Sequence, residues 1–166
     1  MGLGGALLAC SGRGTGDNEP IRVHATVIRP TTDTLRPKDS TRFALPATAY
    51  VCDDGRSLLL QSVSPIGNGM LVRLIYGDSL VSGDYKVVTA GESTTRGAEV
   101  AVRYMIGSVT HLFVADSGSV EVRRGRQALD ARGSGSGIDG GIRTQVTVEY
   151  EEVPVAADTV RCRSEP

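Results

Sequence analysis

Hydrophobic and polar residues alternate along much of the chain. In residues 21–29, apolar side chains occupy every second position, at Ile21, Val23, Ala25 and Val27. A period of two places these four residues on one face of an extended chain. The pattern therefore predicts a strand with one buried face and one polar face.

The same alternation and a series of short apolar runs predict about ten strands and no helix. Turn-forming residues separate the runs roughly every ten residues, a spacing typical of sandwiches and barrels. We therefore expect an all-β domain over 21–166, an antiparallel β-sandwich, with a small β-barrel as the alternative. A hairpin is expected at Asp116-Ser117-Gly118. The segments expected as strands are 21–29, 41–45, 47–52, 57–63, 70–76, 85–90, 97–106, 109–116, 119–124, 144–153 and 158–162.

The composition agrees with a single β-rich domain and argues against two classes of protein. A length of 166 residues suits one domain with a sizeable core. Gly is abundant at 21 residues and Trp is absent, which favours strands and tight turns. The net charge is -1, so the basic surplus of a nucleic-acid-binding protein is lacking. No apolar run approaches the roughly 20 residues that a membrane-spanning helix needs.

The first twenty residues differ from the rest of the chain. Leu7-Leu8-Ala9-Cys10 resembles a bacterial lipobox, in which the Cys thiol is acylated and the chain is cut before it. The following residues, 11–20, are rich in Gly and polar side chains, which fits a flexible tether. The segment 1–20 is therefore interpreted as a signal with a lipid-anchor residue, Cys10, and a tether.

This interpretation predicts an extracytoplasmic protein anchored to the bacterial cell envelope. Ser11, rather than Asp, follows the anchor residue, which resembles an outer-membrane destination in a diderm bacterium. No Lys or Arg precedes the apolar stretch, so we expect the true translation start to lie further upstream or the charged region to be lost. The alternative interpretation is a disordered tail in which Cys10 is incidental.

Two further cysteines, Cys52 and Cys162, remain once Cys10 is set aside. In an exported protein such a pair predicts one disulfide, and the alternative is two buried thiols. We expect no metal site, because there is no Cys-x-x-Cys pair and only His24 and His111 could assist. No cofactor is expected either.

Three segments resemble a family of bacterial secreted lipoproteins with a β-rich domain. The first is the strand 71–74 followed by Ser-Gly-Asp-Tyr-Lys-Val at 82–87, the second is the Ser-Gly-x-Val segment within 113–122, and the third is the closing strand 146–155 followed by Cys162. The resemblance implies a β-rich fold and an extracytoplasmic compartment. It implies no activity.

The stretch Gly135-Ser136-Gly137-Ile138-Asp139-Gly140 matches two binding motifs in part. It satisfies G-x-G-x-x-G, but a dinucleotide site needs a helix after the loop and the residues that follow are strand-like. It also lacks one Gly of a Ca²⁺-binding turn, and such turns work in tandem, so Asp139 is a weak candidate ligand. We therefore expect residues 133–141 to form a flexible loop.

Catalytic residues are not expected. No serine lies in a G-x-S-x-G motif, and His24 is predicted to face solvent, while His111 opens a strand at the surface or at an edge. The carboxylates Asp53 and Asp54 precede a turn glycine, where Asp is favoured for local reasons. Glu149 and Glu151 alternate on one strand face, which indicates a solvated face rather than the paired acids of a glycosidase.

The basic cluster Arg123, Arg124 and Arg126, with Arg132 nearby, surrounds Gly125. A solvated hairpin tip is the favoured interpretation. If the chain binds a polyanion, these arginines are the predicted anion-binding residues.

The leading functional hypothesis is a non-enzymatic envelope lipoprotein that acts as a binding or structural module. Its expected partners are the membrane, through the lipid anchor, and an unknown protein or glycan, but no nucleic acid. Two alternatives stay open: a hydrolase with an unrecognised site, and an inhibitor or chaperone of a secreted enzyme.

Overall fold

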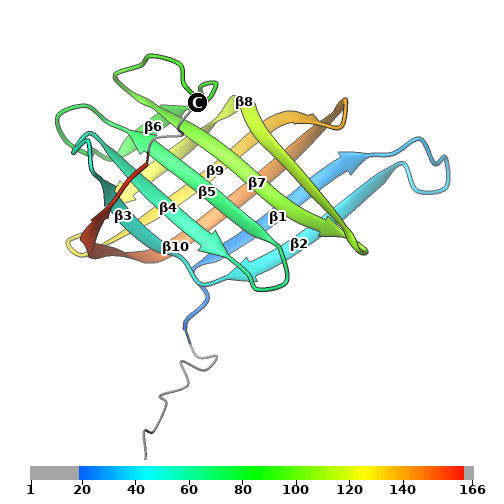
Figure 1. Cartoon of the computed structure of the whole chain (residues 1–166), viewed down its shortest axis with the longest axis horizontal. Helices are drawn as coiled ribbons and strands as arrows, with labels where there is room; N and C mark the ends of the chain where they lie inside the picture. Colours follow the sequence, from blue (N-terminus) through cyan, green and yellow to red (C-terminus); the bar gives the residue numbers. More distant parts are fainter. Residues whose placement is uncertain (1–18, 163–166) are drawn as a thin grey trace, which may run out of the picture.

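The structure, a computed structural model, describes residues 19–162 (Figure 1). The described residues form ten strands and no helix, which confirms the predicted all-β class. It follows that none of them belongs to a helix able to cross a membrane. The strands are β1 Val23–Pro30, β2 Lys38–Leu45, β3 Thr48–Cys52, β4 Ser57–Val63, β5 Gly69–Ile75, β6 Gly83–Lys86, β7 Gly97–Ile106, β8 Val109–Arg124, β9 Ala128–Asp139 and β10 Ile142–Val160.

Two packed sheets share the long strands β8 and β10. Sheet I has the order β2-β1-β10-β9-β8-β6, and sheet II has the order β10-β3-β4-β5-β7-β8. In Figure 1, β4, β5 and β7 cross in front of β1, β9 and β10. Neighbouring strands are antiparallel, except that the end of β10 runs parallel to β3. Because β8 and β10 pass from one sheet to the other, the hydrogen bonding closes into a ring through β3, β4, β5, β7, β8, β9 and β10.

The core lies between the two sheets and largely follows the predicted alternation. Val23, Ala25 and Val27 of β1 are buried, as their period of two predicts. Ile21, expected on the same buried face, precedes β1 and is 55% exposed. Tyr85, Tyr104 and Tyr150 are the largest of the fully buried side chains. Valines, leucines and alanines fill most of the remaining interior.

The expected hairpin at residues 116–118 is wrong, because β8 continues through it. The pairing of β8 with β9 shifts register between Ala115 and Ser117, which marks a bulge rather than a turn. The bulge lies where β8 leaves sheet II and enters sheet I. The sequence signal for a turn therefore corresponds to the bend of one long strand.

The expected loop at 133–141 is also wrong, because residues up to Asp139 belong to β9. Glycines on both strands allow β8 and β9 to approach closely. A Cβ atom on Gly137 would lie 2.2 Å from the carbonyl oxygen of Val114, and one on Gly118 would lie 2.0 Å from that of Ser134. The turn itself is short, and it uses Gly140 and Gly141, whose φ angles are +54° and +84°.

The last two expected strands are one strand, β10. A register shift between Tyr150 and Val153 interrupts its pairing with β9, and Glu152 there has a φ of 46°. After the bulge the strand pairs with β9 at Val153 and Pro154, and from Val155 it pairs with β3. Nearer the N-terminus, β2 begins at Lys38, before the start of the strand expected over 41–45.

A disulfide joins Cys52 to Cys162 across 110 positions, which confirms the predicted pairing. It lies where the end of β10 pairs with the end of β3, through Val160 and Cys52. The bond therefore fixes the C-terminal part of β10 to sheet II. Cys10, the predicted lipid-anchor residue, lies outside the described residues.

Candidate functional site

The outer face of sheet I carries a groove that runs along β8, β9 and β10. It consists of three adjoining hollows of 370, 560 and 300 Å³. The first two share Glu121, Arg132 and Glu149, and the second and third share Ser134 and Thr147. We refer to the three hollows together as the sheet I groove.

The groove follows from the side-chain pattern of β9. Alternation turns Arg132, Ser134 and Ser136 outward, while Gly135 and Gly137 face the core. The two outward serines are small. On β8 they face Ser119 and Ser117, which are equally small, and on β10 they face Thr147 and Gln145. The middle of the sheet is therefore hollowed.

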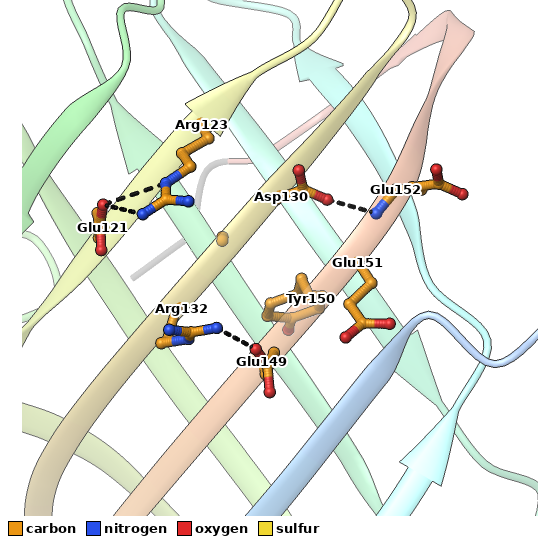
Figure 2. Close-up of a pocket in the computed structure, with 9 residues that line it drawn as sticks. Glu121, Arg123, Asp130, Arg132, Glu149, Tyr150, Glu151 and Glu152 are labelled. Atoms are coloured by element: carbon orange, nitrogen blue, oxygen red, sulfur yellow. Dashed lines mark hydrogen bonds and ion pairs between the residues drawn. The ribbon is translucent and has the colours of Figure 1, made fainter.

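One end of the groove is densely charged (Figure 2). The guanidinium of Arg123 lies 3.2 Å from the carboxylate of Glu121, and Arg132 pairs with Glu149 on the next strand. These pairs occupy both guanidinium groups that line the charged hollows. The lining carboxylates are Asp84, Glu121, Asp130, Glu149, Glu151 and Glu152.

Acidic side chains therefore outnumber basic ones at this end. The hydrogen bond from Arg132 to Glu149, together with the charges of Glu149, Glu121 and Glu151, raises the pKa of the Arg132 guanidinium. The field around Arg132 is thus negative. His24, which the alternation placed on a solvated face, is exposed and lines the middle hollow.

The other end of the groove is polar and carries few charges. The hydroxyls of Ser117 and Ser136 lie 2.9 Å apart, and Gln145 and Thr147 of β10 line the same hollow. Hydroxyl and amide groups can both donate and accept hydrogen bonds. This end can therefore bind the peptide groups of an extended chain.

A second cluster lies inside the fold, where β1, β7, β8 and β9 meet. The Oδ2 atom of Asp139 accepts hydrogen bonds from the Tyr104 hydroxyl at 2.7 Å, from His111 Nδ1 at 2.9 Å and from Arg29 Nε at 3.0 Å. The rings of Tyr104 and His111 stack with their centroids 5.2 Å apart. The carboxylate of Asp139 is 9% exposed.

These contacts determine the charge state of Asp139. Burial alone would raise its pKa, but the hydrogen bonds from Tyr104, His111 and Arg29 and the charge of His111 lower it below its ordinary value. Burial and the adjacent carboxylate raise the pKa of Tyr104. The cluster thus holds an ionised carboxylate between a neutral phenol and a guanidinium.

The cluster contains the aspartate and histidine of a catalytic dyad but not a nucleophile. The bond to Asp139 orients His111 through Nδ1. Within residues 19–162, no Ser, Thr or Cys side chain hydrogen-bonds to His111. Through its three hydrogen bonds, the Asp139 carboxylate links β9 to β1, β7 and β8.

Sequence reasoning singled out His111 and Asp139 separately but missed Tyr104 and Arg29 as their partners. A signal was present in the alternation. His111 is in phase with the buried Phe113, so its side chain points into the fold rather than to an outer face. A polar side chain at a core position needs hydrogen-bond partners inside the fold. The sequence alone does not reveal which residues these are.

Two of the three predicted anion-binding arginines, Arg124 and Arg126, line one hollow, and Arg123 lies apart from them. Arg123 is in the sheet I groove, paired with Glu121. Arg124 points toward the other face of sheet I, where its Nη1 donates to the carbonyl of Leu80 at 3.1 Å. Arg126 is exposed in the turn between β8 and β9. Anion binding by these residues stays a prediction.

The carboxylate of Asp54 belongs to a separate ion-pair network on the outer face of sheet II. It lies 3.0 Å from Arg73, which also contacts Glu99 at 3.4 Å. Burial opposes ionisation of Asp54, but hydrogen bonds from Arg56, Ser57 and Arg73 lower its pKa. Asp54 is therefore part of the structural support of the β3–β4 turn.

Within residues 19–162, no three His, Cys, Asp or Glu side chains are grouped so that they could share a metal ion. Asp139, the weak candidate for a Ca²⁺ ligand, has its Oδ2 atom occupied by three protein donors.

Compared with models of protein families, with curated proteins and with solved structures, the chain matches none of them.

Proposed function

We propose that this chain is an exported, non-enzymatic binding module of the bacterial cell envelope. A lipid on Cys10 would hold it at the membrane. Its ligand would be an extended, positively charged segment of a partner protein, which binds in the sheet I groove. The observation that supports this proposal most directly is that the groove is continuous from its acidic end to its hydroxyl-lined end.

The shape and the charge of the groove support this ligand. The hollows form a channel along neighbouring strands, which suits a linear ligand. At the acidic end, both guanidinium groups are already paired, while no protein cation pairs with Asp84 or Glu151 among the described residues. Complementary charge favours association and orients a ligand on approach. A Lys/Arg-rich segment would pair with these carboxylates.

The compartment has separate support. Disulfides persist in oxidising compartments and are rare in the cytosol. The bond between Cys52 and Cys162 therefore agrees with export. Metabolic labelling with palmitate tests the anchor in cells that produce the chain from its natural start. We expect label on the wild type and none on Cys10→Ser, and equal labelling would overturn the anchor.

Binding is tested by NMR titration of the ¹⁵N-labelled chain with oligolysine, oligoglutamate and an uncharged Gly-Ser peptide. We expect saturable shifts with oligolysine at outward positions of β8, β9 and β10, including the amides of Ser134 and Thr147. The shifts should weaken as salt is added. Saturable shifts with a neutral oligosaccharide instead would overturn the peptide ligand in favour of a glycan.

A matched pair of variants distinguishes binding by the groove carboxylates from an effect of the protein's net charge. Asp84→Asn with Glu151→Gln removes two groove carboxylates, and Glu19→Gln with Asp158→Asn removes two exposed carboxylates elsewhere. The groove variant should bind oligolysine at least about threefold more weakly, and the control should bind as the wild type does. Equal weakening in both variants would refute the groove as the binding site.

A further inference from the structure

One end of the fold holds a cavity of 730 Å³ between the β8–β9 hairpin and the loop before β6. It shares no lining residue with the sheet I groove. Its floor is apolar: Leu58, Leu80 and Leu129 are 3%, 9% and 1% exposed. The volume lies within the range of small-molecule sites, about 300–1,000 Å³.

Two arginines line this cavity. Arg124 is the last residue of β8 and lies opposite the buried Leu129 of β9. Like Val122 two positions earlier, it therefore lies on the inward-facing side of β8. Its Nη1 donates to the Leu80 carbonyl at 3.1 Å, which holds the guanidinium beside the apolar floor. The side chain of Arg126 makes no hydrogen bond or ion pair within residues 19–162.

The remaining polar groups at the cavity are few. Asp78 is the one carboxylate among the lining residues, and the hydroxyl of Tyr76 lies 3.4 Å from the carbonyl of Ser57. Two guanidinium groups against one carboxylate leave the cavity wall positively charged. An apolar floor beside a positive wall suits a ligand with an alkyl chain and an anionic head.

We propose that this cavity binds an amphipathic anion, namely a monomeric medium-chain fatty acid. The alkyl chain lies on Leu58, Leu80 and Leu129, where it removes apolar surface from water. The carboxylate lies toward Arg124 and Arg126, with which it forms charge-assisted hydrogen bonds. This site is separate from the binding of a basic segment in the groove, so either can fail alone.

Isothermal titration calorimetry of the full chain with decanoate, below the concentration at which it forms micelles, tests the proposal. Decanol and decyltrimethylammonium keep the alkyl chain and replace the head with a neutral or a cationic group. We expect decanoate to bind at least about tenfold more tightly than either comparator. Equal binding of all three would overturn a site selective for anions.

The chain offers a matched control at the next position along β8. Arg124→Gln and Arg126→Gln each remove a cavity charge, whereas Arg123→Gln removes the same charge from the outer face. We expect the Kd for decanoate to rise about tenfold in each cavity variant and to stay within about twofold in Arg123→Gln. A similar rise in all three variants would show a general charge effect and would refute the site.

A blocking variant tests the location without changing charge. Val155 lines the cavity and is 40% exposed, so Val155→Trp can fill the cavity without disturbing the core. The chain has no other Trp, so the indole also reports folding by its fluorescence. Loss of decanoate binding with folding retained supports the site, and unchanged binding overturns it. Binding to phosphatidylglycerol vesicles without binding to monomeric decanoate would also overturn it, in favour of a membrane-docking surface.

Discussion

Asp139 and His111 lie on neighbouring strands at one end of the fold, with 2.9 Å between Oδ2 and Nδ1. The same oxygen accepts a hydrogen bond from Tyr104 and pairs with Arg29. Four strands thus meet on one carboxylate. Because the carboxylate is buried, its ionisation is coupled to the stability of this end of the fold.

Replacing Asp139 with Asn should change the acid stability of the protein. The folded-state pKa of Asp139 lies below its ordinary value, so the carboxylate stabilises the fold above about pH 4 and loses this effect as the pH falls through the folded-state pKa. Asp139→Asn should cost about 2–4 kcal/mol at neutral pH, because it leaves Arg29 without its partner. It should also flatten the decline of stability below about pH 4.

Urea unfolding at a series of pH values measures both effects. Asp158→Asn is the control, since Asp158 is exposed and makes no hydrogen bond or ion pair among residues 19–162. Parallel acid profiles for Asp139→Asn and the wild type would contradict this role of the cluster.

Gly137 is predicted to be intolerant of any side chain. A Cβ atom there would lie 2.2 Å from the Val114 carbonyl oxygen and 2.8 Å from the ring of Phe113. Gly137→Ala should therefore force β8 and β9 apart and destabilise the fold by about 3 kcal/mol or more. Ser136→Ala, at the adjacent outward position, should change the stability by less than about 1 kcal/mol. Thermal unfolding of the two variants checks the difference.

Gly137 also shows why part of the fold could not be predicted. The alternation in 97–106 gave the strand and its buried face correctly, because burial on one face dictates the pattern directly. The glycines of 133–141 carry no such pattern. Gly is equally suited to a mobile loop and to a close approach of two backbones, and only the pairing of β9 with β8 distinguishes them.

The candidate sites depended on the same non-local information. The alternation of the sequence places Arg123 and Arg124 on opposite faces of a strand. It did not reveal that this strand is part of the long β8, because a turn was expected at 116–118. The groove needs β8, β9 and β10 to be neighbours, and the register of those pairs is not visible in the sequence. The disulfide was predictable because Cys52 and Cys162 were the only pair left in the described domain.

Removing the disulfide should lower the stability substantially. A cross-link that closes a loop of 110 positions restricts the unfolded chain by about 4–5 kcal/mol in the chain-entropy description. Cys52→Ala with Cys162→Ala should therefore unfold at a much lower urea concentration than the wild type. A reducing agent should lower the wild type to the same midpoint and leave the double variant unchanged. No change on reduction would contradict a stabilising bond.

Tyr104 and Tyr150 should respond in opposite ways to the loss of their hydroxyl groups. Both are about 1% exposed, so Tyr→Phe leaves the packing of the ring almost unchanged. The Tyr104 hydroxyl donates to the Asp139 carboxylate, whereas the buried Tyr150 hydroxyl lies near Ser62 and makes no hydrogen bond of ordinary geometry, since the Ser62 hydroxyl donates to the Met70 carbonyl. Tyr104→Phe should cost about 2 kcal/mol, because it removes a charge-assisted bond. Tyr150→Phe should leave the stability unchanged or raise it by about 1 kcal/mol, because it removes an unsatisfied polar group from the core. Urea unfolding of both variants at neutral pH checks the signs, and a clear loss of stability in Tyr150→Phe would show that its hydroxyl has a partner in solution.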